Sequence, residues 1–110
     1  MNIKTEKIND VVLVILAGEL NMDNSNLLRD TFKNILKGMD HKILVDLEKL
    51  SFMDSSGIAT LIELSQNLVK VKGNMRLCRV NKQITGVLEI TKVHKLFNIF
   101  ETREIALNGF

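Results

Sequence analysis

The sequence lacks proline, tryptophan and tyrosine altogether, and it has only one cysteine among its 110 residues. The absence of proline fits a compact chain without extended linkers. Cys78 has no partner for an internal disulfide. With only five scattered phenylalanines as aromatics, nothing offers a platform on which bases could stack, so no direct nucleic-acid partner is expected.

Long apolar runs are also missing. None reaches the ~18 residues that a membrane span needs, and no basic-then-apolar leader opens the chain. His41 and His94 have no second ligand at a suitable spacing, so neither a metal site nor a cofactor is predicted. Cys78, inside an apolar run, is expected to be a small buried hydrophobe in a reducing compartment. Together these features predict a cytoplasmic protein with no membrane association.

The composition that remains is ordinary for a globular protein. Apolar residues make up 45% and charged residues 25%, and the net charge is only +2. A length of 110 residues predicts one domain with one core, spanning 1–110. The basic residues between 70 and 82 are expected to form a solvated face.

Two kinds of apolar pattern alternate along the chain. Strands are predicted at 1–7, 11–17, 42–47, 75–80 and 96–100, the first two joined as an antiparallel hairpin by Asn9-Asp10. Helical spacing places Leu28, Phe32, Ile35 and Leu36 on one stripe, Ile58, Leu61, Ile62, Ser65, Leu68 and Val69 on a second, and Ile84, Val87 and Leu88 on a third. Residues 18–25 are expected to leave the second strand, 91–95 to form a loop, and 102–107 a last helical turn or two. The alternation predicts a small α/β fold: a mixed, mostly parallel sheet of four to five strands with helices packed on it.

One stretch, Ser51-Phe52-Met53-Asp54-Ser55-Ser56-Gly57, joins the third predicted strand to the long helix. Asp54 or Ser55 is predicted to cap the helix by accepting a hydrogen bond from its first turn. Gly57 places no side chain there, so backbone donors are expected to stay open to a partner or an anion. A serine beside a carboxylate, at the positive end of a helix dipole, is well placed to gain and lose a phosphate.

These residues resemble a known family. Gly18-Glu19-Leu20, the apolar strand Ile43–Leu47 and the stretch Ser51–Gly57 together look like the STAS domain of anti-sigma factor antagonists. The resemblance covers essentially the whole chain, because the order of strands and helices and the total length also agree. It implies a single STAS domain.

The resemblance further implies a switch. In that family the unphosphorylated protein binds an anti-sigma factor, and a sigma factor is thereby released for transcription. The anti-sigma factor is typically a serine/threonine kinase that phosphorylates the serine after the aspartate, here Ser55, and a phosphatase resets the cycle. On this interpretation the protein is the substrate of an enzyme and is not an enzyme itself.

The partner-binding residues implied in this way lie in two loops. They are Asn21, Met22 and Asp23 in the first loop, and Met53, Asp54, Ser55, Ser56 and Gly57 in the second. Asn21 departs from the family pattern, which often has aspartate there; asparagine keeps the hydrogen-bonding shape but loses the charge, which Asp23 can partly restore. Of Phe52 and Met53, one is expected to face the core and the other a partner.

Three alternatives stay open. The chain could be a STAS interaction module of a stress-signalling scaffold or of a membrane transport complex, or a constitutive binding module whose serine is never modified. A serine hydrolase would need a histidine base near Ser55 or Ser56. His41 and His94 both lie away from that stretch in the sequence, and the Gly-x-Ser-x-Gly elbow is absent.

Overall fold

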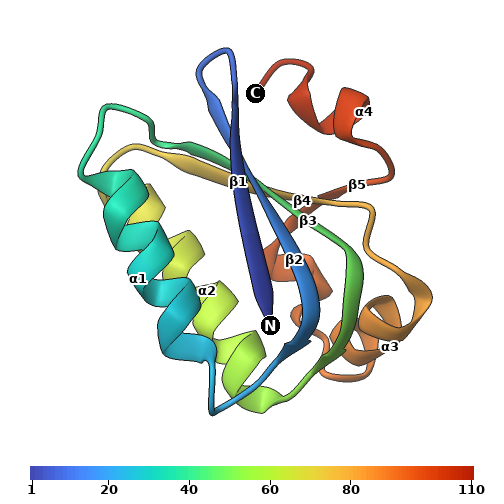
Figure 1. Ribbon diagram of the computed structural model, residues 1–110. Coiled ribbons are helices and arrows are strands. Elements are labelled where there is room, and N and C mark those ends of the chain that lie inside the picture. Colours follow the sequence, from blue (N-terminus) through green and yellow to red (C-terminus); the bar gives the residue numbers. More distant parts are fainter.

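The computed structural model describes residues 1–110 as one five-stranded sheet with helices on both faces (Figure 1). The elements in chain order are β1 (Asn2–Ile8), β2 (Val11–Leu20), α1 (Ser25–Leu36), β3 (Lys42–Met53), α2 (Ser55–Lys70), β4 (Asn74–Cys78), α3 (Lys82–Ile90), the 3-10 helix η1 (Val93–Leu96), β5 (Asn98–Phe100) and α4 (Arg103–Leu107). This is the α/β architecture that the alternating pattern predicts.

The strands lie in the sheet in the order of the sequence, β1-β2-β3-β4-β5. The β1–β2 hairpin is antiparallel, as predicted, and β2 to β5 are parallel. Each parallel pair is joined through a helix, so the carboxyl ends of β2, β3 and β4 share one edge of the sheet. That edge carries the loops after Leu20 and after Met53.

The main core lies on one face of the sheet. Phe32 of α1, Leu61 and Leu68 of α2 and Ile84 of α3 pack there against strand residues such as Val45. Figure 1 shows α1 and α2 side by side, and Arg29 of α1 joins Glu63 of α2 by an ion pair with an Nε–Oε2 distance of 2.8 Å. A stripe with helical spacing buries only one side of each helix, which is why these amphipathic segments cover a single sheet face.

A smaller core on the opposite face lies under α4. It contains Val11, Leu13, Leu44, Cys78 and Ala106. This second core explains why residues 11–17 are apolar on both sides. It also confirms Cys78 as a buried thiol, and burial raises its pKa to about 12.

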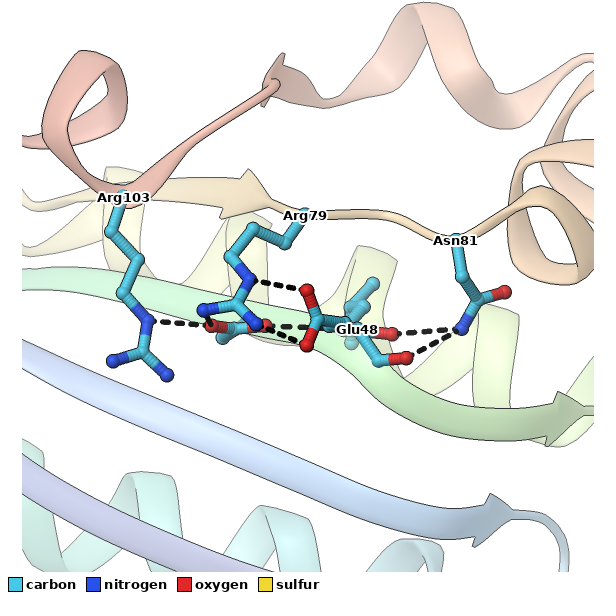
Figure 2. A network of polar contacts seen from close by, with 6 residues as sticks. Glu48, Arg79, Asn81 and Arg103 are labelled. Atoms are coloured by element: carbon cyan, nitrogen blue, oxygen red, sulfur yellow. Dashed lines mark hydrogen bonds and ion pairs between the residues drawn. The ribbon is translucent and has the colours of Figure 1, made fainter.

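Polar side chains hold the C-terminal segment on this face. Arg76 of β4 donates to the carbonyl oxygens of Ala106 and Asn108, and its guanidinium stacks on the rings of Phe100 and Phe110. Beside it, the buried carboxylate of Asp46 accepts a 2.6 Å bond from Nε of Arg103 (Figure 2).

A second arginine completes the network around Asp46. Arg79 lies 3.7 Å from Oδ2 of Asp46 and pairs with both carboxylate oxygens of Glu48 (Figure 2). The hydrogen bond to Glu48 raises the pKa of the Arg79 guanidinium. The only buried carboxylate of the sheet thus has two cationic partners, as a buried charge requires.

Asp46→Asn should therefore loosen the C-terminal segment. The amide keeps the shape of the side chain but gives Arg103 a neutral acceptor, and we expect unfolding to become easier by about 2 kcal/mol. Alkylation of Cys78 should become faster, because a thiol with a pKa of about 12 under α4 reacts only when that segment opens. Urea denaturation and timed labelling at pH 8 measure the two effects. Asp10→Asn, the same change in the exposed pair with Lys42, should alter neither, and an equal effect there would contradict the role of Asp46.

The strand bounds differ from the sequence prediction in the middle of the sheet. β2 continues to Leu20 and β3 to Met53, beyond the predicted ends at residues 17 and 47. The extensions pair with each other, with Glu19 opposite Phe52 and Leu20 opposite Met53. Residues 18–20 therefore do not leave the strand, and Ser51–Met53 is strand and not loop.

Smaller corrections apply elsewhere. β4 ends at Cys78, because Arg79 adopts a positive φ of 53° that takes the chain out of the strand. Residues 93–96 form η1, so the last strand begins at Asn98 and not at 96. On α2, Val69 is 68% exposed and Leu64 is buried in its place, so the apolar stripe is rotated from the predicted one.

Candidate functional site

Two loops meet at the carboxyl ends of β2 and β3, the edge where sites of parallel sheets usually lie. They are residues 21–24 between β2 and α1, and the strand-to-helix junction at Asp54. The backbone N–H of Asp54 donates to the carbonyl oxygen of Leu20 at 3.2 Å, which continues the β2–β3 pairing to the start of α2. The two groups of residues predicted to bind a partner lie in these two connections and in the adjoining ends of β3 and α2.

Asp54 links the two loops through both of its carboxylate oxygens. Oδ1 accepts a 2.9 Å bond from the N–H of Gly57 and so caps α2, as predicted. Oδ2 accepts a 3.1 Å bond from the N–H of Met22 in the other loop. A change at Asp54 therefore alters both loops, although they are 32 residues apart in sequence.

The turn at residues 21–24 is held by asparagine side chains. Oδ1 of Asn21 accepts from the N–H of Asp23 at 3.0 Å, and the N–H of Asn21 donates to Oδ1 of Asn24 at 2.9 Å. Asn24 also donates from Nδ2 to the carbonyl oxygen of Glu19 at 2.7 Å. Asn21 thus has a local structural role, and Asn24, absent from the predicted partner-binding set, fixes the turn beside it.

Ser55 is the first residue of α2 and is exposed, and its hydroxyl makes no hydrogen bond to the rest of the protein. Ser56 is half-buried, and its carbonyl oxygen accepts a bond from the hydroxyl of Thr60. Free N–H groups and the dipole make the first turn of a helix a favourable place for an anion. Of the two serines, Ser55 is the more exposed.

Gly57 is buried where α2 crosses the end of β2. A methyl group at its α-carbon would lie 2.8 Å from the carbonyl oxygen of Leu20 and 2.7 Å from Cγ of Met53, both closer than atoms normally approach. Its N–H is bonded to Asp54. The N–H of Gly57 is therefore not one of the backbone donors expected to stay open in this turn, and the contact between the helix and the strand is a further reason for a glycine here.

The apolar residues beside the loop separate into a buried and an exposed one. Met53 is 2% exposed and supports Gly57 from the core, so its prediction as a partner-contacting residue is corrected. Phe52 is 48% exposed, and Met22 in the neighbouring loop is 72% exposed. Phe52 is not among the predicted partner-binding residues, although one of Phe52 and Met53 was expected to face a partner. The alternation of apolar residues in the sequence did not show which of Phe52 and Met53 faces the core.

The histidines lie away from these loops. His41 precedes β3 at the opposite edge of the sheet, and His94 is in η1. No group of three histidine, cysteine or acidic side chains could hold a metal ion, and no helix is long and apolar enough to cross a bilayer. Ser55 and Ser56 have no base from which a hydrolase could be built.

Comparison with known proteins agrees with this arrangement. The model of the STAS domain family matches residues 2–106. The chain belongs to the STAS domain family. This confirms the resemblance seen in the sequence, and it makes the strand–Asp-Ser-Ser-Gly–helix junction part of a STAS fold.

Named relatives within the STAS family include regulators of sigma factors. The anti-sigma F factor antagonist of Paenibacillus polymyxa is 27% identical over 108 residues, covering 97% of this chain and 92% of that protein. The Bacillus cell fate determinant SpoIIAA in its phosphorylated form has a TM-score of 0.73 at 25% identity, covering 97% of both chains. Protein TM1081 of Thermotoga maritima shares the fold, with a TM-score of 0.88 at 23% identity over 96% of this chain and 91% of that one.

Proposed function

We propose that this STAS protein is an anti-sigma factor antagonist whose binding is switched by phosphorylation of Ser55. In the unphosphorylated state it binds an anti-sigma factor that is also a serine/threonine kinase, and a sigma factor is released. The kinase phosphorylates Ser55 and the two proteins part, and a phosphatase restores the first state. The protein acts in the cytoplasm as a binding protein and a kinase substrate, without catalytic activity of its own. One observation carries the proposal: Ser55 has an exposed, unbonded hydroxyl at the start of α2, directly after Asp54, whose carboxylate binds the loop that carries the exposed Met22.

The geometry allows the phosphate to be added without a change of fold. A phosphate brings roughly −1.5 to −2 charges and three acceptor oxygens. At the first turn of α2 the helix dipole favours that charge by about 0.3–1 kcal/mol. The Ser55 hydroxyl gives up no hydrogen bond when it is modified, and both oxygens of Asp54 remain bonded. The effect of the modification therefore falls on the partner.

The proposed contact surface combines the two loops. Met22 and Phe52 supply apolar area, since both have large exposed side chains. Asp23, Ser55 and Ser56 supply polar contacts beside them. Asn21, Asp54 and Gly57 hold the loops in place. A phosphate on Ser55 adds nearly two negative charges to this surface, and a partner would have to desolvate them.

The labelling experiment decides which serine is used. Incubated with the cognate kinase and ATP, the parent should gain one phosphate, Ser55→Ala none, and Ser56→Ala nearly one, because Ser55 is the exposed serine of the pair and Ser56 is half-buried. Intact-mass spectrometry and peptide mapping measure the stoichiometry and the site. Label retained by Ser55→Ala at the parental level would contradict the assignment.

The nearest alternative is a STAS module of a signalling scaffold or a transport complex. The same surface could serve there, and the partner found with the protein separates the possibilities. Purification from the native host should yield a kinase of the anti-sigma type and a fraction phosphorylated on Ser55. Recovery of a transport protein, with Ser55 unmodified, would favour the alternative.

A further inference from the structure

A groove of about 370 Å³ lies beside the proposed contact surface, between β3 and the start of α3. Residues 48–51 form one wall and residues 81–83 the other, and only one of these seven residues is hydrophobic. The groove exists because β3 runs on to Met53 while its neighbour β4 stops at Cys78. Past that point the edge of β3 has no strand beside it.

Asn81 fixes the shape of the groove. Its Nδ2 lies 3.1, 3.1 and 2.6 Å from the carbonyl oxygens of Leu47, Glu48 and Leu50, all on the unpaired edge of β3. Its Oδ1 accepts from the N–H of Ile84 and caps α3. One side chain thus bonds to both β3 and α3, and Figure 2 shows its amide nitrogen directed at carbonyl oxygens of β3.

The rim is positively charged. Glu48 is the only acid in the groove, and Arg79 neutralises it through an ion pair. Lys49 and Lys82 are both exposed and take part in no ion pair. Two free ammonium groups therefore stand on opposite walls of one groove.

The position of Lys82 argues for a binding role. It is the first residue of α3, where the helix dipole disfavours a cation. The charge there works slightly against the stability of the helix, which an acidic residue would improve. No group within the chain pairs with the Lys82 ammonium, so its charge is available to a partner.

We infer that this groove is a second contact site for the anti-sigma partner and accepts an acidic segment of it, with Lys49 and Lys82 on either side of its carboxylates. The inference rests on the proposed function, since it names a second contact of the same partner. The groove and the Ser55 loop both lie along the C-terminal part of β3, so one protein surface can reach both. The lysine contacts are not altered by phosphorylation of Ser55 and contribute affinity and association rate in either state.

Charge reversal tests the inference. Lys49→Glu and Lys82→Glu should each weaken binding to the purified anti-sigma kinase of the same host by roughly tenfold, and the double variant by more. Lys82→Glu should at the same time raise the melting temperature or leave it unchanged, so lost affinity cannot come from lost folding. Lys95→Glu in η1, with the same change of charge outside the groove, is the matched control and should bind like the parent.

Calorimetric titrations at low and high salt complete the test. The affinity of the parent should fall as the salt concentration rises. The affinity of the double variant should fall less, because it lacks the lysine charges whose attraction salt screens. If the parent binds the kinase and the double variant binds it equally well, the groove is not a contact site, and the proposed function still stands. A parent that fails to bind any anti-sigma kinase would overturn both.

Discussion

Phosphorylation of Ser55 should weaken binding to the anti-sigma partner by about 30-fold to several thousand-fold. Unpaired charges at an interface cost roughly 2–5 kcal/mol, and each 1.4 kcal/mol corresponds to about one factor of ten. Ser55→Asp should fall between the parent and the phosphorylated protein, because it carries one charge where phosphate carries nearly two. Ser55→Ala should bind like the parent and, in a cell, leave the target genes on. Titration calorimetry of all four forms gives the order of affinities.

The folded state should be nearly the same in all four forms. Aspartate is favourable in the first turn of a helix, so the unfolding free energy of Ser55→Asp should lie within about 0.5 kcal/mol of that of the parent. Chemical denaturation checks this before any titration. If phosphorylated parent and Ser55→Asp both bind as tightly as unmodified parent, charge at Ser55 does not control binding.

Gly57→Val should destabilise the protein by about 3 kcal/mol or more, the largest stability effect expected here. Any β-carbon at this position meets the carbonyl oxygen of Leu20 and the side chain of Met53 at under 3 Å, and valine adds two methyl groups to it. That carbonyl is backbone and is bonded to the N–H of Asp54, so it cannot move without disturbing the loop. Urea denaturation should show a lower midpoint with an unchanged slope.

Gly86 provides the control for the glycine effect. It lies within α3 with open space around its α-carbon, so Gly86→Ala should gain about 0.5–1 kcal/mol from helix propensity. Gly57→Ala, the same change, should instead lose stability. If the two alanine substitutions change the free energy of unfolding in opposite directions, the loss at residue 57 is caused by its contact with β2. If Gly57→Ala were as stable as the parent, the close contact would not be what requires the glycine.

The order of strands and helices and the position of the junction that carries Ser55 could be predicted from the sequence alone. Long apolar segments with clear periods, separated by turn residues, leave few arrangements for a chain of this length. A side-chain cap at the start of α2 was also predictable, with Asp54 or Ser55 as the acceptor, and the structure selects Asp54. The resemblance to the STAS family rested on the same local features.

The C-terminal part of β3 was not predictable, and its bulges explain why. The pairing register between β2 and β3 shifts twice near the carboxyl ends of the two strands. Each shift inserts one extra residue into β3 and reverses which of its side chains face the core. Leu47, Leu50 and Met53 are buried, a spacing of three that does not have the alternation by which strands are recognised. Sequence therefore could not assign Ser51–Met53 to a strand, nor choose Met53 over Phe52 as the buried residue.

Contacts between distant residues were decided only by the tertiary structure. The bond from Met22 to Asp54, the closeness of Leu20 to Gly57 and the pairing of Arg103 with Asp46 each join segments more than 30 residues apart. Nothing local to either partner specifies such a contact, because it exists only once the sheet has set the strands side by side. Local chemistry in the sequence determined which loop carries the serine, and the packing of β2 against β3 and α2 determined how that loop is held.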